Sequence, residues 1–581
     1  MLPGESGGPS APAPAPTRRG GGRFRAAFRV LAHGGPGSLL RRARRFAAKR
    51  LEERTPLDEA CRRALEEGTA PDVLRLLSER ADGLLHPPRI DVVLVRRRSA
   101  GPPGAAREKI ALALRAYRHA SISGETLPED ADGPALVSLL ERLTGDFLFL
   151  VREGDSLRPG AIAEAALFAH EHPSLSFLFG DEEAPHAGTD RTVPLWKPGW
   201  SPDLFRSAFY TGWPVVVRRT DALSAARGLG GRGAAALYGL LLRLHEREGS
   251  VLHVASILGR RGTPLEADRA GGEDGAMRRA LAAWAEPRIA GASVEAGRVP
   301  GSWRLRRPGP GGRSVSVIIP TRDGRRWLER CVPGVREERP REILVVDNGS
   351  RDPACLEYLA ALESRGEARV LRRPGPFDFS SMMNGAARAA SGDHLLFLND
   401  DTEVLEKGSI EAMAEEAERP DVAAVGALLL YPDGKIQHAG LVVGMGVVAG
   451  HVYKGGETGG VPFFVSPELP REVSAVDGAC FLVRKELFLG LGGFDEEHLP
   501  VSFSDVDFCL RARERGLRIL FTPHARFLHH ETRSRSPDLD EREVAWMERR
   551  WGDRLTADPF YHPALSLLSE APRPRRGGRS R

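Results

Sequence analysis

The sequence predicts an α/β fold in which short parallel strands alternate with helices. Three apolar runs carry this prediction: residues 315–320 (VSVIIP), 342–347 (EILVVD) and 395–398 (LLFL). The first two are rich in β-branched residues, and each run is followed by a polar turn, as expected of strands buried on both faces of a parallel sheet. Because open α/β sheets bind ligands at the carboxyl ends of their strands, we expect functional side chains directly after these runs.

Polar residues do follow each predicted strand. Residues 320–323 (PTRD) follow the first strand, residues 347–350 (DNGS) the second, and residues 399–401 (NDD) the third. Adjacent carboxylates at the end of a buried strand suit a hard cation such as Mg²⁺ or Mn²⁺, and a nearby imidazole favours Mn²⁺. Asp400 and Asp401 are therefore predicted to hold a cation against a phosphorylated ligand.

Length and composition bound the protein class. A chain of 581 residues is too long for one hydrophobic core. Its five cysteines form no CxxC pair, which favours a reducing compartment over a disulfide framework or a thiolate zinc site. No run of about 18 apolar residues is present, and the N-terminal residues do not resemble a secretory signal. We therefore expect a cytoplasmic protein without a transmembrane helix.

Composition shifts divide the chain into six predicted parts. The C-terminal half contains the strands described above, and a second α/β pattern lies upstream of it. The predicted parts are a disordered Pro/Ala/Gly tail (1–22), a basic helical segment (23–88), an upstream α/β domain (89–300), a Pro/Gly linker (301–313), a main α/β domain (314–565) and a basic disordered tail (566–581).

The basic N-terminal segment has two readings. Residues 17–50 contain ten arginines and one lysine but no acid, and the end of the segment has helical apolar spacing. A basic amphipathic helix could lie on the anionic inner face of the cytoplasmic membrane as a peripheral contact. A solvated basic tail followed by a packed helix explains the pattern equally well. Nucleic-acid binding is not expected, because no recognition motif accompanies the charge.

Residues 504–507 (SDVD) are the candidate for a general base. Transfer of a sugar from a nucleotide sugar leaves negative charge on the diphosphate, which a divalent cation stabilises. The attacking acceptor hydroxyl must lose a proton to a carboxylate on the other side of the sugar. Asp505 opens a helical pattern downstream of a Gly-Gly-Phe-Asp turn. A carboxylate at this position could equally be a capping residue.

Seven segments in order resemble a known family. They are VSVIIPTRD, EILVVDNGS, FDFSSMMNGAARAASGDHLLFLNDDTEV, GKIQHAG, AVDGACFLVRKELFLGLGGFDEE, FSDVDFCLRARERG and FLHHETRSR. Together, over residues 315–535, they resemble a family 2 glycosyltransferase of the branch that builds rhamnose-rich and O-antigen-type bacterial polysaccharides. The resemblance implies a GT-A fold, a Rossmann-like open mixed sheet.

The resemblance also implies roles for individual residues. Asp505 is implied to be the general base of an inverting displacement. Asp401, with Asp400 and His529, is implied to hold Mg²⁺ or Mn²⁺. The implied donor-binding residues are Pro320, Thr321, Asp323, Asp347, Asn384, Asn399 and Asp400, and the implied acceptor-side residues are Gly478, Ala479 and Asp507.

Three features depart from this pattern or offer another reading. Asp477 stands where a small hydroxyl residue is expected, and Asp378 replaces a common Asn close to the expected diphosphate site. The His529-His530-Glu531 run could form a zinc site, but its spacing is poor for tetrahedral coordination. His438 and His451 flank a Gly-rich run and are expected to be structural or acceptor-side residues.

The upstream domain resembles a degenerate first module of tandem glycosyltransferases. Its segments are GDFLFLV, FLFGDEE and WKPGWSPD. Only Asp155 remains of an acidic cluster, and an Ala-rich run at 234–236 occupies the position of the base-bearing acids. We expect this module to be structural or to help bind the acceptor. A separate metal site at Asp181, Glu182 and Glu183 is the alternative.

The sequence therefore predicts an inverting, metal-assisted glycosyltransferase. It would transfer a sugar from a nucleotide-diphosphate donor to a growing glycan or lipid-linked glycan. Two alternatives remain: a non-catalytic glycan-binding or scaffold protein of a polysaccharide assembly complex, and a nucleotidyltransferase. The second would need a basic Gly-rich phosphate loop near the first strand, which IPTRDG lacks.

Overall fold

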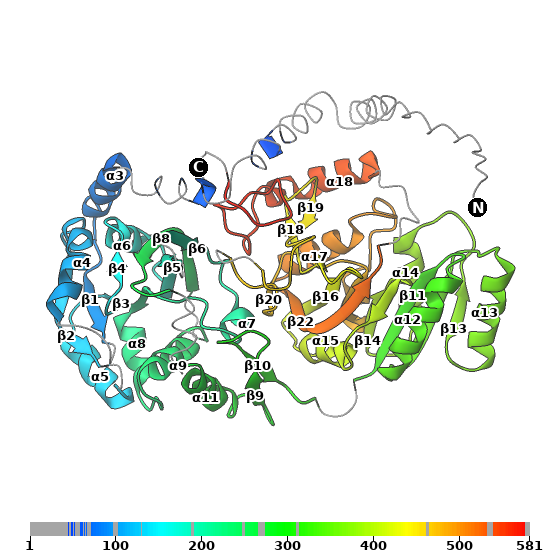
Figure 1. Ribbon diagram of the computed structural model, residues 1–581, viewed down its shortest axis with the longest axis horizontal. Coiled ribbons are helices and arrows are strands. Elements are labelled where there is room, and N and C mark those ends of the chain that lie inside the picture. Colours follow the sequence, from blue (N-terminus) through cyan, green and yellow to red (C-terminus); the bar gives the residue numbers. More distant parts are fainter. Residues whose placement is uncertain are drawn as a thin grey trace, which may run out of the picture.

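The computed structural model describes residues 71–575 apart from short gaps, together with single positions between residues 45 and 66. The gaps are residues 97–102, 129–130, 187–190, 247–249, 265–272, 310–312, 461–463 and 532–538. The described chain forms two α/β domains, each built on its own sheet, that lie side by side (Figure 1). The tail expected at 1–22, and most of the basic segment before residue 71, lie outside the described residues.

The N-terminal domain contains a mixed sheet in the order β2-β1-β3-β7-β5-β8-β4, with β6 paired to β5. Its strands are β1 (Ile90–Val95), β2 (Ala120–Leu127), β3 (Phe147–Arg152), β4 (Ser156–Leu157), β5 (Leu175–Pro185), β6 (Thr192–Leu195), β7 (Val215–Arg218) and β8 (Ser250–Arg260). Its helices are α3 (Pro71–Asp82), α4 (Pro103–Arg115), α5 (Gly133–Arg142), α6 (Ala161–Glu171), α7 (Pro202–Phe205), α8 (Arg219–Ala226), α9 (Ala234–Leu244) and α11 (Glu273–Ala285). A hairpin of β9 (Ser293–Ala296) and β10 (Trp303–Arg306) follows.

The C-terminal domain contains a mixed sheet in the order β13-β12-β11-β14-β21-β16-β22-β15, with β17 paired to β16 and β20 paired to β22. Its strands are β11 (Val315–Thr321), β12 (Glu342–Asp347), β13 (Arg369–Arg372), β14 (His394–Leu398), β15 (Thr402–Val404), β16 (Val422–Leu430), β17 (Ile436–His438), β20 (Arg471–Glu472), β21 (Cys480–Arg484) and β22 (Arg518–His529), beside a hairpin of β18 (Leu441–Val443) and β19 (Ala449–His451). Its helices are α12 (Arg325–Glu337), α13 (Pro353–Ser364), α14 (Phe379–Ala389), α15 (Ser409–Ala417), α16 (Lys485–Gly490), α17 (Ser504–Glu514) and α18 (Glu541–Trp551), with the 3-10 turn η1 (Gly552–Leu555).

The two sheets repeat one topology. In each, a parallel set of strands (β2-β1-β3, and β12-β11-β14) is followed by an antiparallel strand (β7, β21). The next strand, β5 or β16, pairs in parallel with the long strand β8 or β22. Helix α9 precedes β8 as α17 precedes β22. The chain is thus a tandem of two α/β domains with related sheets, as the sequence predicts.

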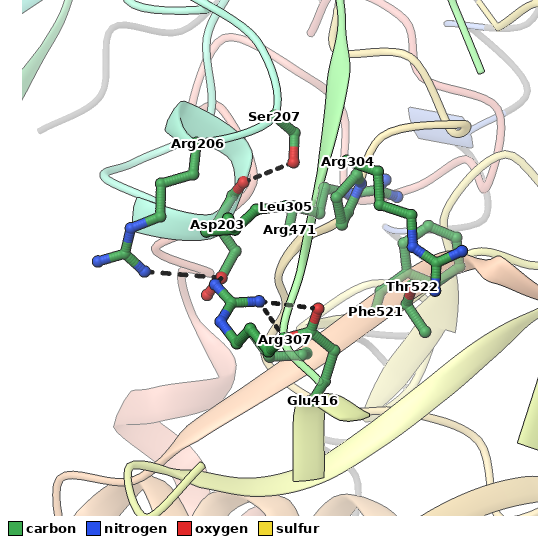
Figure 2. A pocket seen from close by; sticks show the side chains of 12 residues that line it. Asp203, Arg206, Ser207, Arg304, Leu305, Arg307, Glu416, Arg471, Phe521 and Thr522 are labelled. Atoms are coloured by element: carbon green, nitrogen blue, oxygen red, sulfur yellow. Dashed lines mark hydrogen bonds and ion pairs between the residues drawn. The ribbon is translucent and has the colours of Figure 1, made fainter. Parts of the chain in front are cut away.

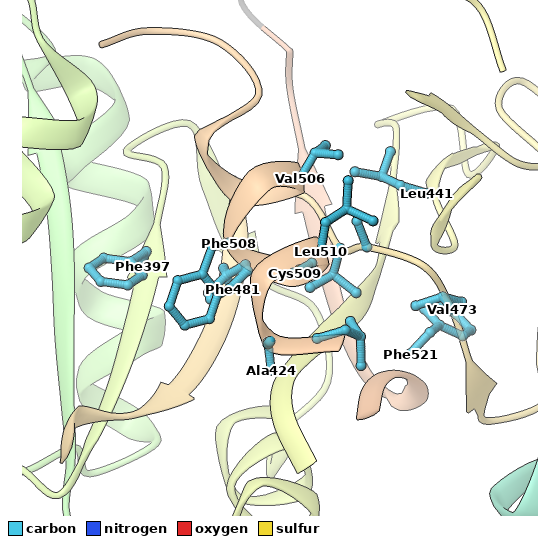
Figure 3. Close-up of a cluster of buried hydrophobic side chains, with 14 of the residues drawn as sticks. Phe397, Ala424, Leu441, Val473, Phe481, Val506, Phe508, Cys509, Leu510 and Phe521 are labelled. Carbon is cyan, nitrogen blue, oxygen red and sulfur yellow. The ribbon is translucent and has the colours of Figure 1, made fainter. Parts of the chain in front are cut away.

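Alternate residues of the central strands enter different cores. In β11, Val317 and Ile319 belong to one buried cluster and Ile318 to another, because successive side chains point to opposite faces of a strand. On one face, Phe481 and Phe508 pack with ring centroids 5.6 Å apart, and Phe397 lies 6.2 Å from Phe481 (Figure 3). This packing fixes the first turns of α17 against the sheet.

An ionic contact joins the two domains. Ser201 caps the short helix α7, and Asp203 in that helix accepts two hydrogen bonds from Arg419 (2.6 and 3.1 Å) and one from Arg518 (2.6 Å). Figure 2 shows Asp203 beside Arg206 and Arg307, each with a nitrogen 3.7 Å from the carboxylate. We call Asp203 and its four arginines the arginine junction. Asp203 itself lies in the WKPGWSPD segment singled out in the sequence.

Two predicted boundaries differ from the structure. Part of the expected linker 301–313 forms β10, and Trp303 is buried in the N-terminal core because it packs on Tyr238. Residues 566–575 of the expected disordered tail pack on the C-terminal domain: Ser566 is buried and bonded to Glu52, and the backbone at 567 and 570 accepts hydrogen bonds from residues 446 and 453. Among the described residues, no helix has the length and apolarity to cross a bilayer.

Candidate active site

Two strands of the C-terminal sheet bring the first predicted polar residues to one edge. In the parallel pair β11 and β12, Pro320 lies opposite Val346 and Thr321 opposite Asp347. Strand β14, on the other side of β11, ends at Leu398, so Asn399 and Asp400 follow at the same edge. The Thr321 hydroxyl donates a 2.7 Å hydrogen bond to Oδ2 of Asp400. The strands therefore assemble residues that are far apart in the sequence.

Gly324 is required by this close approach. A Cβ at this position would lie 2.3 Å from Oδ2 of Asp400 and 2.4 Å from Oγ1 of Thr321. Both distances are shorter than side chains tolerate, so only glycine allows the loop after β11 to cross the Thr321–Asp400 hydrogen bond.

Asp323 and Asp347 order the turns after β11 and β12. Asp323 has a positive φ of 52°, and its carboxylate accepts hydrogen bonds from the backbone of Arg351 (2.6 Å) and Asp352 (2.8 Å). These two bonds lower the pKa of Asp323. The buried Asp347 accepts from the backbone N–H of Ser350 (2.9 Å) and contacts Arg372 (3.1 Å). Asp323 is exposed, so its carboxylate also faces solvent at the strand ends.

Asp401 and His529 form the pair best suited to a cation. Oδ1 of Asp401 lies 3.3 Å from Nε2 of His529, where β15 meets the end of β22. Two ligands at right angles on an octahedral ion are about 3 Å apart when each lies about 2.1 Å from it, so this pair fits one side of a Mg²⁺ or Mn²⁺ ion. The structure thus brings Asp401 and His529 together, while Asp400 is engaged with Thr321.

The His-His-Glu run does not form a zinc site. His529 faces Asp401, His530 contacts Glu403 at 2.6 Å, and Glu531 contacts Lys454 at 3.0 Å. His529 and His530 diverge because successive residues at the end of a strand point to opposite faces. Glu531 lies beyond the strand and has a positive φ of 47°. Among the described residues, the clusters that could hold a metal lie elsewhere, at Asp181, His253 and His562 and at His438, His451 and Asp477.

Asp505 lies half-buried in the first turn of α17. Phe503, just before the helix, has a positive φ of 62°, an uncommon conformation that turns the chain into α17. Oδ2 of Asp505 accepts a 2.7 Å hydrogen bond from the backbone N–H of Gly478, and Oδ1 accepts one from Val506 (2.8 Å). Its enclosure by protein, and then the negative charge of Asp477, raise the pKa of Asp505 to about 7. A carboxyl with that pKa exchanges a proton near neutral pH, as a general base must.

Two predicted site residues are engaged elsewhere. Asn384 is buried, and its amide is used by the 493–496 turn: Nδ2 donates to Phe494 O (2.9 Å) and Glu496 Oε1 (2.8 Å), and Oδ1 accepts from Phe494 N (2.9 Å). Asp507 is 1% exposed and accepts from Trp551 (2.9 Å) and Arg511 (2.7 Å). Asn384 therefore does not present its amide to a donor, and Asp507 does not line an acceptor site.

Asp378 and the acceptor-side turn have defined local roles. Asp378 caps α14 by accepting from Ser381 N (2.8 Å), so its charge is directed at a helix N-terminus. Gly478 and Ala479 belong to a turn whose N–H groups hold carboxylates: Gly478 binds Asp505, and Ala479 donates to Asp477 at 3.0 Å. The predicted acceptor-side pair is therefore adjacent to Asp505.

Sequence reasoning missed the contact between His438 and His451. Their Nδ1 atoms are 3.1 Å apart, and Nε2 of His451 lies 3.8 Å from Asp477. The two histidines are 13 residues apart and meet because the β18–β19 hairpin turns the chain back beside β17. Their position on either side of a Gly-rich run was visible in the sequence, but the hairpin register was not.

The N-terminal helix that corresponds to α17 has no acid in its first turn. Helix α9, the counterpart of α17, begins with Ala234 and Ala235. Asp155, the remaining acid after β3, accepts from the backbone of Gly262 (2.9 Å) and contacts Arg152 (3.3 Å).

The three acids of β5 do not converge on one ion either. Asp181 contacts His253 (2.9 Å) and His562 (2.6 Å), Glu182 contacts Lys197 (2.8 Å), and Glu183 contacts Arg158 (2.9 Å). The alternative prediction is therefore wrong: Asp181, Glu182 and Glu183 do not form one metal site together. Asp181 instead joins two histidines, one of which lies in the C-terminal segment.

Comparison with known proteins places the site in a family. Residues 316–489 match the family model described as Glycosyl transferase family 2. The chain is 37% identical over 451 residues to the O-antigen biosynthesis protein RfbC of Myxococcus xanthus, a match that spans 73% of this chain and 34% of the relative. A match to the uncharacterized protein y4gI of Sinorhizobium fredii is 35% identical and spans 74% of this chain and 49% of the relative. The chain thus spans a third to a half of the length of these two relatives.

A shorter relative matches about a third of the chain. The N-acetylglucosaminyl-diphospho-decaprenol L-rhamnosyltransferase of Mycobacterium tuberculosis is 29% identical over 228 residues, which are 35% of this chain and 70% of the relative. Among solved structures, GalNAc-T7 with UDP, GalNAc and Mn²⁺ matches at 17% identity and a TM-score of 0.35, over 42% of this chain and 49% of that chain. A similarity this low carries no conclusion about substrate or metal.

Proposed function

Because this chain belongs to the family 2 glycosyltransferases, with the family domain at residues 316–489 of its C-terminal sheet, we propose that it is an inverting transferase with Asp505 as its general base. The supporting observation is the environment of Asp505. One carboxylate oxygen is held by the N–H of Gly478, and the pKa of the group is raised to about 7. A base with a pKa near the working pH combines availability with proton affinity.

The donor binds at the carboxyl ends of β11, β12 and β14 in this proposal. Asp323 and Asp347 order the loops that receive the nucleoside, and Thr321 fixes Asp400 beside them. These side chains are already held by hydrogen bonds within the protein, so the donor meets an organised site rather than one it must order.

Asp401 and His529 are the residues that would hold a divalent cation. When bound, Mg²⁺ or Mn²⁺ neutralises negative charge that develops on the departing diphosphate. Both side chains are buried, so their position is fixed before any ligand arrives. The ion's remaining ligands would have to come from the donor or from water, since Asp400 is bonded to Thr321.

The acceptor enters on the side of the 477–479 turn. Its hydroxyl oxygen attacks the anomeric carbon, the bond to the diphosphate oxygen breaks, and the hydroxyl proton passes to the Asp505 carboxylate. A single displacement of this kind inverts the anomeric centre. The turn places two N–H groups and two carboxylates at the proposed point of attack.

The sugar and acceptor classes are taken from the relatives. One relative is named an L-rhamnosyltransferase acting on a decaprenol-linked sugar, and another an O-antigen biosynthesis protein. We therefore propose a nucleotide-diphosphate sugar as donor and a growing bacterial surface glycan, free or lipid-linked, as acceptor. Such an acceptor would place the protein in the cytoplasm at the inner face of the membrane, where the basic N-terminal segment could make a peripheral contact.

The test is nucleoside diphosphate release from a panel of UDP-, GDP- and dTDP-sugars with Mn²⁺, with and without a lipid-linked glycan. Wild-type protein and Asp505→Asn are compared with Asp132→Asn, which alters a helix cap in the N-terminal domain where Asn caps equally well. We expect Asp505→Asn to lose about 10²- to 10⁴-fold in rate and the control to lose none. Donor binding without release by wild type under any acceptor would instead support a scaffold role.

A further inference from the structure

The 477–479 turn holds two carboxylates through consecutive backbone groups. Oδ1 of Asp477 accepts from the N–H of Ala479 at 3.0 Å, which closes a small ring on the turn. The preceding N–H, that of Gly478, then points at Oδ2 of Asp505, 2.7 Å away. The side chain of Asp477 thus fixes the amide that orients the base.

The two histidines behind Asp477 have defined proton positions. Gly440 N–H donates to Nε2 of His438 (3.3 Å), so a neutral His438 carries its proton on Nδ1. That proton can only be donated to Nδ1 of His451, 3.1 Å away. His451 is therefore protonated on Nε2, the nitrogen that faces Asp477 at 3.8 Å. One chain of N–H groups runs from Gly440 to the carboxylate of Asp477.

Burial favours the neutral form of both imidazoles. Burial lowers the pKa of His438 to about 3 and also lowers the pKa of His451. Asp477 behaves in the opposite way: burial works against its ionisation, but His451 and His438 hold its pKa at about 2. At neutral pH the assembly is a carboxylate that faces the N–H of a neutral imidazole at 3.8 Å.

His438, His451 and Asp477 could also be interpreted as a metal site, but the proton shared by the two imidazoles opposes this. His438 and His451 face each other through Nδ1, and the 3.1 Å separation is that of a hydrogen bond with a shared proton. Both nitrogens would have to lose that proton to ligate an ion. The other nitrogen of His438 already accepts from Gly440.

We propose that Asp477, held in place by the His451–His438 pair, is a positioning residue that sets the orientation and proton affinity of Asp505. This inference rests on the proposed function of Asp505. The negative charge of Asp477 makes Asp505 a stronger base, and the turn that Asp477 closes holds the carboxylate in place. This role accounts for the acid at position 477, where a small hydroxyl residue is expected.

Other titratable and charged groups lie near Asp505 and Asp477. Asp505 is influenced by Asp477 on the turn, and the buried Cys509 lies one turn further along α17, its pKa raised by burial so that it stays neutral. Around the histidine pair, the charged groups are Arg471, Lys454, Glu531 and Glu570, and His529 acts on both His438 and Asp477 from across the site. Asp477 is thus the neighbouring charge that raises the pKa of Asp505.

The experiment is the pH dependence of kcat/KM and kcat for nucleoside diphosphate release by wild type, Asp477→Asn, His451→Phe and His451→Gln. Asp477→Asn keeps the acceptor for Ala479 N–H but removes the charge. We expect its acidic limb to move down by about one pH unit or more, and its maximal kcat to fall because the base is weaker. His451→Phe should shift the limb in the same direction, whereas the Gln amide can still donate to Asp477 and should restore the wild-type profile.

Different results separate the possible failures. If Asp477→Asn and His451→Phe lose activity with an unchanged acidic limb, the residues are only structural and the proposal is overturned. If release by wild type does not depend on Asp505, the proposed function itself fails. Thermal denaturation of each variant shows whether it is folded, and Asp132→Asn controls for a conservative Asp→Asn change far from the site.

Discussion

Replacing Asp203 with Asn should destabilise the protein far more than an ordinary surface change. Asp203 is 7% exposed, and Arg419 and Arg518 donate to it at 2.6 Å from the other domain. Burial opposes the ionisation of Asp203, but Arg419, Arg206 and Arg307 hold its pKa well below the usual range. Removing one partner of a buried ion pair leaves the other charge uncompensated, at a cost of about 3–5 kcal/mol. Arg307, Arg419 and Arg518 also contact Glu416, Asp421 or Glu472, so we expect the lower end of this range.

Urea denaturation of Asp203→Asn beside Asp221→Asn gives the comparison. Asp221 faces Arg218 at 3.8 Å and is partly exposed, so its loss should cost below about 1 kcal/mol. A carboxylate with a depressed pKa stabilises the fold above its unfolded pKa, and this stabilisation falls as pH drops through the folded value. The difference between wild type and Asp203→Asn should therefore shrink below about pH 4. If the two variants lose the same stability at neutral pH, the reasoning about the arginine junction is refuted.

Three further predictions concern the C-terminal domain. The pKa of Asp505 is raised from 3.8 to about 7, so we expect the rate to fall below pH 7. Ionisation of Asp505 should also cost the folded state stability, increasingly as pH rises from 3.8 to 7. The Asp505→Asn variant should therefore gain stability over wild type across that range, as measured by Tm at several pH values. Gly324→Ala would place a methyl group 2.3 Å from Asp400, so we expect weaker donor binding by calorimetry, whereas Gly490→Ala, with open space around its Cβ, should bind normally. Asn384→Ala leaves buried partners of the 494–496 turn unsatisfied and should cost about 2–4 kcal/mol in urea denaturation, with donor affinity unchanged in the fraction that remains folded.

The strands and the positions of the acids could be predicted because they depend on local patterns. The runs ending at Thr321, Asp347 and Leu398 are mostly apolar, and parallel strands place their ends at one edge. Residues that follow such strands meet whatever the details of the connecting helices. The prediction of Asp505 at the start of a helix is confirmed for the same reason, since its sequence opens a helical pattern.

The partners of side chains could not be predicted because they depend on long-range packing. The amide of Asn384 is taken up by residues 110 and 112 positions later, and His562 reaches Asp181 across 381 positions. Resemblance placed Asn384 near the donor, but a local sequence pattern carries no information about which backbone groups compete for an amide. The divergence of His529 and His530 likewise follows from their positions on a strand.

The arginine junction has a consequence for any attempt to study the catalytic half alone. Cutting the chain near residue 313 would remove Asp203 and Ser201, and with them the acid between Arg419 and Arg518 and the hydroxyl bonded to Glu472. The excised half would keep Glu416, Asp421 and Glu472 beside these two arginines, but it would lose the buried carboxylate that both of them share. A new partner domain that supplied an acid at the same place would restore this contact. The N-terminal domain thus supplies a buried acid that two arginines of its neighbour share.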